Sequence, residues 1–208
     1  MVNCPDLVSV KEKIEAARSF LTPGDFLHVD VADGVFSFHT TWNDPVGWRD
    51  LHLPFAIEAH LMVEHPLVWI SPWLAAGVKR FIIHIETING EVFDAIAELC
   101  KNAGAEFGLS SNPETPARPM QSYLGRVNFF QVLGVNPGLS GQNFLPLTLA
   151  KVKWLRENAP RAIIEVDGGM TPETAKFAKD AGADVVVSAS YIFGSNDPKK
   201  AYEELKNI

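Results

Sequence analysis

The sequence contains few cysteines, no long apolar run and no excess of basic residues. Its two cysteines, Cys4 and Cys100, lie far apart and form no CxxC motif, so we expect free thiols in a reducing compartment. No apolar run approaches the ~18 residues that a membrane-spanning helix needs, and the charged first dozen residues are unlike a signal peptide. The formal net charge of −7 argues against a general nucleic-acid binder, because phosphate backbones select clustered Lys and Arg. We therefore expect a cytoplasmic protein that binds neither membranes nor nucleic acid.

A chain of 208 residues is long enough for one large domain with a full core. Short apolar runs rich in β-branched or aromatic residues are typical of strands, and here they alternate with segments of helical periodicity. The predicted strands are FLHVDV, AIEAHLMV, RFIIHI, EFGLSS, FFQVLGV, AIIEVD and DVVVSAS, with an eighth at residues 1–4. The alternation predicts a single (β/α)8 TIM barrel over residues 1–208. An open doubly wound sheet is disfavoured because no GxGxxG turn follows the first strand. The least periodic segment, PARPMQSYLGRV, predicts a weak or short helix.

Four polar side chains stand at the carboxyl ends of predicted strands, namely His28, Asp30, His60 and Asp167. Residues 28 and 30 are two apart on a strand, so both side chains leave the same face. Convergence of the four groups at one end of a parallel barrel gives a metal site with two histidines and two carboxylates. The carboxylates are also available for proton transfer, which suits enolisation of a carbonyl compound. Such ligands fit one divalent ion, Zn²⁺, Fe²⁺, Mn²⁺ or Co²⁺, without choosing among them.

Longer motifs resemble the ribulose-phosphate 3-epimerase family. HVDVADG is similar to the second-strand His-x-Asp-x-Met-Asp-Gly of that family, and EAHLMVEHP to its third-strand HLMV-x-x-P. GVNPGLSGQNFLPLTLAKVKWLR resembles its glycine-rich loop and the following helix, and IIEVDGGMTPETAKFAKDAGADVVVSASYIF resembles its DGG strand and final phosphate-binding turn. HIETING and SNPETP are most similar to the branch that acts on allulose 6-phosphate. The motifs follow the family order over nearly the whole chain.

The resemblance implies a (β/α)8 barrel of the ribulose-phosphate-binding type and a ketose-phosphate 3-epimerase. The implied substrates are D-ribulose 5-phosphate and D-xylulose 5-phosphate, or a close hexulose phosphate, interconverted through a cis-enediolate. The family's metal ligands fall on His28, Asp30, His60 and Asp167, and its two acid–base carboxylates fall on Asp30 and Asp167. Inversion at C3 needs one carboxylate on each face of the enediolate, one as base and the other as acid.

The phosphate group of such a substrate needs backbone amides at glycine-rich turns and helix N-termini. Three turns qualify, and the resemblance puts the phosphate site of the family at the same loops. We expect phosphate binding by Gly138, Leu139, Ser140, Gly141, Gly168, Gly169, Ala189 and Ser190. Barrels generally bind phosphate near strands seven and eight, which agrees with these positions.

The chain also departs from the family pattern around the predicted ligands. The family's first-strand serine falls on Met1, and two of its pocket methionines are replaced by Ala32 and Leu133. Met62 is retained, so we expect Met62 and Leu133 to line the pocket over the enediolate. The acidic residue usual before Pro-Gly is Asn136, and the family's His-Phe-Val-Pro-Asn loop is replaced by residues 35–39. Because that loop closes on substrate, its change favours a shifted substrate over changed chemistry.

Two other functions stay open at this point. A divergent barrel could bind a sugar phosphate without turning it over, as the missing serine and altered loop suggest. A phosphate-barrel decarboxylase is less favoured, because its second strand carries Asp-x-Lys-x-x-Asp and the stretch at residues 30–33 has no lysine. The expected partner in each case is a small sugar phosphate, and association into a homo-oligomer is possible.

The remaining histidines and the tryptophans have plainer interpretations. His84 ends a predicted strand, where a structural or supporting role beside the site is favoured. The other three histidines are expected on loops or the surface, and three tryptophans at helical spacing are expected to pack helices onto the barrel. These are His39, His52 and His65, and Trp69, Trp73 and Trp154.

Overall fold

The computed structural model describes residues 1–208. The chain divides into two compact units, Met1–Phe107 and Gly108–Ile208, each described by itself below. Organisation as a single domain stays a prediction. None of the helices combines the length and the apolar character required to cross a membrane.

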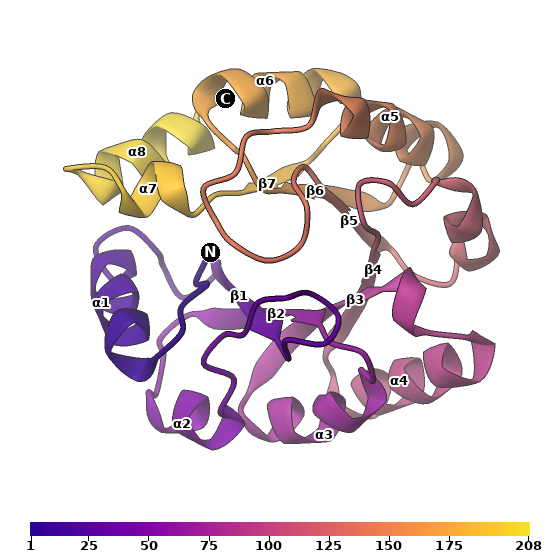
Figure 1. Ribbon diagram of the computed structural model, residues 1–208, viewed down its shortest axis with the longest axis horizontal. Coiled ribbons are helices and arrows are strands. Elements are labelled where there is room, and N and C mark those ends of the chain that lie inside the picture. Colours follow the sequence, from indigo (N-terminus) through magenta and orange to yellow (C-terminus); the bar gives the residue numbers. More distant parts are fainter. The chain divides into compact units, whose positions relative to one another are not determined.

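In the first unit, parallel strands alternate with helices (Figure 1). Strand order follows sequence order, and the register pairs Asp30 of the first strand with His60 of the second. The strands are β1 (Phe26–Ala32), β2 (Ala56–Met62) and β3 (Val78–His84). The helices are α1 (Leu7–Ala17), α2 (Pro45–Asp50), α3 (Leu67–Ala75) and α4 (Gly90–Ala103), with a 3-10 turn, η1 (Ile85–Thr87).

The eighth strand expected at residues 1–4 is reduced to a single bridge. Val2 pairs in parallel with Val29 of β1. The Val2 N–H donates to the His28 carbonyl at 2.7 Å, and the Asp30 N–H donates to the Val2 carbonyl at 3.0 Å. The N-terminal segment is therefore fixed beside the part of β1 that carries the predicted ligands.

The second unit repeats the alternation of parallel strands and helices. Strand β4 (Glu106–Ser110) begins just before the unit boundary and is followed by β5 (Phe129–Leu133), β6 (Ile163–Asp167) and β7 (Val185–Val187). The helices are α5 (Leu149–Asn158), α6 (Pro172–Ala181), α7 (Ser190–Phe193) and α8 (Pro198–Lys206). The weak helix expected around residue 120 is the 3-10 segment η2 (Arg118–Tyr123), and a second one, η3 (Pro146–Thr148), precedes α5.

Local chemistry explains where the helices begin and end. The Asp6 and Asn89 side chains cap α1 and α4, and Thr171 forms a capping box at the start of α6, which satisfies N–H groups that lack helical partners. Helix α4 ends at Gly104, whose φ of 66° is the left-handed conformation that glycine adopts readily. Of the tryptophans predicted to pack helices, Trp73 is completely buried, whereas Trp69 and Trp154 are half-buried.

Candidate metal and active site

Three of the four predicted ligands gather at the carboxyl ends of β1 and β2. His28 and Asp30 leave the same face of β1, and the parallel register brings His60 beside Asp30. One ligand atom of each lies within 4.8 Å of those of the other two. All three side chains are at least 96% buried. In the second unit, Asp167 ends β6 and is equally buried.

The ring orientation of His28 is fixed by a buried ion-pair chain. Its Nδ1 lies 2.6 Å from Glu58 Oε1, and Arg80 Nη1 donates to Glu58 Oε2 at 2.6 Å. Arg80 Nε in turn donates to Glu106 Oε2 at 2.6 Å. Because a carboxylate only accepts, His28 donates from Nδ1 to Glu58, and its Nε2 faces Asp30 Oδ1 at 3.3 Å. A carboxylate behind one ring nitrogen is the usual support of a metal-binding histidine.

Glu58 stays ionised although it is buried. Burial opposes the charge, but the hydrogen bonds and charges of His28 and Arg80 outweigh it and lower the Glu58 pKa to about 2 from 4.5. The neighbouring carboxylates overcome the burial of the Arg80 guanidinium in the same way and raise the Arg80 pKa. Glu58 and Arg80 thus form a pair in which each partner keeps the other charged.

Replacing Glu58 by Gln is expected to lower the free energy of unfolding by about 2 kcal/mol at pH 7, the typical worth of hydrogen bonds to charged groups. A carboxyl with a lowered pKa stabilises the fold above its ordinary pKa, and that stability is lost as the pH falls through the folded pKa. The difference in free energy of unfolding between wild type and Glu58→Gln should therefore decrease as the pH falls from 4.5 towards 2. Urea unfolding across this range measures it, with the exposed Glu98→Gln as control. A difference in free energy of unfolding that does not change with pH would contradict the stabilising role of the ionised Glu58 carboxylate.

His60 stands in a second chain of hydrogen bonds. Its Nδ1 lies 3.2 Å from Asp30 Oδ1, and its Nε2 lies 2.8 Å from His84 Nε2. His84 Nδ1 lies 3.3 Å from Glu86 Oε2, and the His60 and His84 rings are stacked with centroids 5.0 Å apart. Burial lowers the pKa of His60 despite the adjacent Asp30 carboxylate, so the imidazole is neutral. His84 was expected to have a supporting role beside the site, and in the structure it lies against His60.

Asp30 is the centre of these contacts. Its Oδ1 faces both His28 and His60, and its Oδ2 accepts a hydrogen bond of 2.7 Å from Asn3 Nδ2. Burial opposes ionisation, but hydrogen bonds from His28 and His60 outweigh it and lower the Asp30 pKa. Sequence reasoning missed Asn3, although a polar residue in the otherwise apolar MVNC stretch was a signal.

The loop between β1 and α2 makes further contacts at this end of the strands. The Asp33 carboxylate accepts the Phe36 N–H at 3.0 Å and the Glu64 N–H at 2.8 Å, tying the loop to the end of β2. Phe36 packs against His84 with ring centroids 4.5 Å apart. His39, expected on a loop or the surface, lies on this loop but reaches Asn3 Oδ1 through its Nε2 at 2.8 Å. No local pattern in the sequence indicates that contact.

The predicted phosphate-binding turns lie close to one another within the second unit. A Cβ on Gly168 would lie 2.4 Å from Val135 Cγ2, and a Cβ on Gly141 would come within 4.0 Å of Ser190 Cβ. Gln142 Nε2 donates to the carbonyls of Asn136 and Leu139, both at 2.8 Å, and so braces the glycine-rich loop. The predicted pocket residues Met62 and Leu133 are each 2% exposed near the carboxyl ends of β2 and β5.

The Gly169→Ala substitution should be costly for two reasons. Gly169 has a φ of 68°, and a Cβ there would lie 2.7 Å from the backbone of Phe144. Gly104→Ala is a matched control, because Gly104 has a φ of 66° and nothing within 4 Å. We expect a loss of about 1 kcal/mol for the control and of about 3 kcal/mol or more for Gly169→Ala, measured by urea unfolding. Equal losses would show that the loop yields to the added methyl group.

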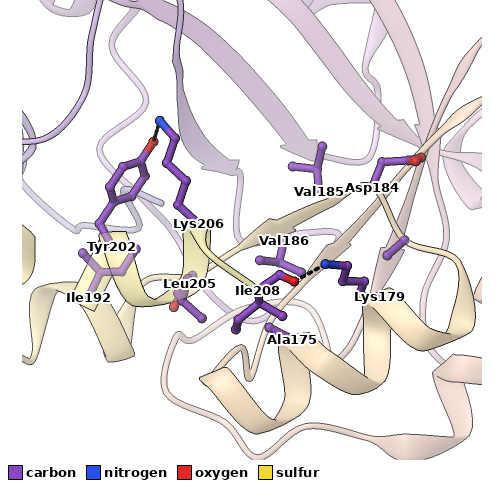
Figure 2. A pocket seen from close by; sticks show the side chains of 12 residues that line it. Ala175, Lys179, Asp184, Val185, Val186, Ile192, Tyr202, Leu205, Lys206 and Ile208 are labelled. Carbon is purple, nitrogen blue, oxygen red and sulfur yellow. Dashed lines mark hydrogen bonds between the residues drawn. The ribbon is translucent and has the colours of Figure 1, made fainter. Parts of the chain in front are cut away.

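A cavity of about 670 Å³ in the second unit has none of the predicted site residues in its lining, although Ser188, which precedes Ala189, lines it. It lies among α6, β7 and α8 and has mainly apolar walls (Figure 2). Lys179 donates to the Ile208 carbonyl there, and Lys206 donates to Tyr202 Oη at 3.4 Å. Its lining contains no group of histidines and carboxylates comparable to that at β1 and β2.

Comparison with known sequences identifies close counterparts over most of the chain. The model of the "Ribulose-phosphate 3 epimerase family" matches residues 5–193. A ribulose-phosphate 3-epimerase of Helicobacter pylori is 35% identical over 208 residues, covering 98% of this chain and 93% of the relative. The cytoplasmic isoform of ribulose-phosphate 3-epimerase from Oryza sativa subsp. japonica is 34% identical over 197 residues, covering 92% and 86%.

Solved structures with little sequence identity share the fold. The 3-hexulose-6-phosphate synthase of Salmonella typhimurium has a TM-score of 0.72 at 13% identity, covering 95% of this chain and 92% of that one. KGPDC from Streptococcus mutans in complex with D-R5P has a TM-score of 0.72 at 17% identity, covering 95% and 91%. The predicted fold class, a (β/α)8 barrel, is confirmed. With its motifs, its fold and these relatives, the chain belongs to the ribulose-phosphate 3-epimerase family and is an isomerase that acts on carbohydrates.

Proposed function

We propose that the protein is a metal-dependent 3-epimerase that interconverts D-ribulose 5-phosphate and D-xylulose 5-phosphate, or acts on a close hexulose phosphate. The observation that carries this proposal is the buried group of His28, Asp30 and His60. The relatives of this protein that are named ribulose-phosphate 3-epimerase support the same reaction. The KGPDC structure described in complex with D-R5P supports a sugar phosphate as the ligand.

The donor atoms in the first unit fit a divalent cation. His28 Nδ1 is engaged by Glu58, and His60 Nε2 by His84. The two remaining ring nitrogens face the same oxygen of Asp30 at 3.3 and 3.2 Å. Two imidazole nitrogens and a carboxylate suit Zn²⁺, Fe²⁺, Mn²⁺ or Co²⁺. We propose that Asp167 completes this ligand set, as in the family pattern.

The bound cation would supply electrostatic stabilisation of the negative charge that develops on the substrate oxygens. In our proposal the side chains do the rest. Asp30 and Asp167 lie on opposite faces of the substrate carbon C3, where one removes the proton and the other returns one. The lowered pKa of Asp30 keeps its carboxylate ionised, which is the form that a proton acceptor must have before the reaction. Burial of both carboxylates excludes water that would compete for the proton.

We propose that the substrate phosphate is held by Gly138 to Gly141, Gly168, Gly169, Ala189 and Ser190. Their close approach within the second unit supports this. Backbone N–H groups at glycine turns bind phosphate without needing lysine or arginine. Met62 and Leu133 would cover the apolar side of the pocket. The oligomeric state and the cytoplasmic location stay predictions.

A turnover panel tests the proposal. The protein is freed of metal, loaded separately with Zn²⁺, Mn²⁺, Co²⁺ and, without oxygen, Fe²⁺, and given D-ribulose 5-phosphate or D-allulose 6-phosphate. Chromatography should show the C3 epimer with at least one metal and one sugar. Tight sugar-phosphate binding without product from any pair would support a non-catalytic binding protein instead. A β-keto acid phosphate is supplied as a third substrate, and release of CO₂ from it would point to decarboxylation.

A further inference from the structure

We propose that His39 and Asn3 are positioning residues for Asp30, and that they couple the loop at residues 33–41 to the proton-transfer carboxylate. The inference rests on the proposed function for the role of Asp30. It goes beyond that function by assigning work to two residues outside the ligand set. Both lie in the first unit, as does Asp30.

Contacts other than the hydrogen bond to Asp30 also restrain Asn3. Its side chain is only 9% exposed. The adjacent Val2 is fixed to β1 by two backbone hydrogen bonds, and Lys13 Nζ of α1 contacts the Asn3 carbonyl at 3.4 Å. The amide therefore approaches Asp30 from a restrained backbone, which keeps the entropy cost of the 2.7 Å hydrogen bond small.

The direction of each hydrogen bond in the chain follows from the groups involved. An ionised carboxylate only accepts, so Asn3 turns its Nδ2 donor towards Asp30 Oδ2. The other amide atom, Oδ1, only accepts, so His39 Nε2 carries a proton and donates to it at 2.8 Å. The result is a continuous chain of donors from His39 through Asn3 to Asp30.

His39 lies where the loop passes from its exposed tip to its anchored end. Near the tip, Phe38 is fully exposed and Val35 is 68% exposed. At the anchored end, Thr41 Oγ1 donates to the Asp30 carbonyl at 2.9 Å and accepts the Ala32 N–H at 3.0 Å. A movement of the loop tip should therefore displace the half-buried His39 more than Thr41, because Thr41 is hydrogen-bonded to β1.

The two oxygens of Asp30 have different surroundings, and this makes its orientation important. Oδ2 is held by Asn3, whereas Oδ1 faces His28 and His60. Loss of the Asn3 contact would let the carboxylate rotate away from this arrangement. A misplacement of about 1 Å can cost about 10²-fold in rate. The chain departs from the family pattern close to Asn3 and His39. The family serine falls on Met1, and residues 35–39 differ from the loop sequence of the family.

Paired substitutions test the donor role of His39. His39→Phe fills similar space but donates nothing to Asn3, whereas His39→Gln offers an amide N–H in its place. For the metal-loaded enzyme we expect His39→Phe to lower kcat by about 10- to 100-fold with KM changed by less than about threefold. His39→Gln should recover most of the rate. The exposed His65→Phe is the control and should behave as wild type.

A measurement independent of turnover accompanies the kinetics. Hydrogen exchange of the Asn3 side-chain amide, followed by NMR in protein labelled with ¹⁵N-asparagine, should be at least about tenfold faster in His39→Phe, because the hydrogen bond no longer restrains local opening. His39→Gln should keep the wild-type rate. Wild-type kcat and exchange in His39→Phe, or equal losses in both His39 variants, would overturn the inference. An inactive wild type would instead overturn the proposed function, while the exchange rates still decide the coupling.

Discussion

Asp167→Asn is expected to reduce epimerisation at least about 10³-fold, within the range that a positioned acid or base contributes. Asparagine has nearly the same shape as aspartate and keeps an oxygen that can face a metal ion, but it cannot accept the C3 proton. The local backbone should be unchanged, because Asp167 contributes its carbonyl oxygen, not its side chain, to the 2.7 Å hydrogen bond from the Gly134 N–H. The loss should therefore fall on kcat rather than on folding.

The measurement compares kcat, metal content and thermal unfolding of wild type and Asp167→Asn. Asp180→Asn, an exposed change on α6, is the control for removing one negative charge. If Asp167→Asn binds one metal ion per chain and keeps more than about a tenth of the wild-type kcat, its activity is higher than the removal of an acid–base group allows. That result would remove Asp167 from the proton-transfer pair.

His84→Leu is expected to weaken metal binding about 10- to 100-fold, the usual cost of losing the partner of a metal-binding histidine. With the proposed metal ion bound, His60 Nδ1 would serve as the ligand and the imidazole proton would sit on Nε2, which would donate to His84 Nε2 over the 2.8 Å contact. His84 then donates from Nδ1 to Glu86 at 3.3 Å. Leucine cannot accept the His60 proton, so the imidazole loses the contact that fixes its tautomer and orientation.

Competition with a chromophoric chelator gives the dissociation constants. His84→Gln supplies a side-chain oxygen that can accept from His60 Nε2, so it should recover most of the affinity. The exposed His65→Leu controls for loss of a histidine elsewhere. Equal affinity in wild type and His84→Leu would show that Asp30 alone orients His60.

The strand positions and the polar side chains at their ends could be predicted from the sequence because the signals are local. Two-residue spacing puts His28 and Asp30 on one face of β1, and a run of apolar residues is enough to recognise the strand. The glycine turn at Gly168 and Gly169 was likewise predictable, since both residues have positive φ and close neighbours.

Other parts of the fold could not be predicted because tertiary contacts decide them. Helix α8 has the sequence PKKAYEELK, with few apolar residues, and is held by the burial of Ala201 and Leu205. Helix α2 is only 6 residues long, too short for a periodic pattern. At the site, the contact of Asn3 with Asp30 joins residues 27 apart, and that of His39 with Asn3 joins residues 36 apart. No local pattern carries such pairings.

The most direct test of the account is the ¹H NMR spectrum of D-ribulose 5-phosphate in D₂O with the metal-loaded protein. Proton transfer by the carboxylates predicts that the C3 proton signal disappears as xylulose 5-phosphate forms, because solvent deuterium replaces the abstracted proton. D-allulose 6-phosphate is tested in parallel and should lose its C3 proton if the preferred substrate is the hexulose. Retention of the C3 proton in both sugars, with one metal ion bound per chain, would contradict the assignment of this site to epimerisation.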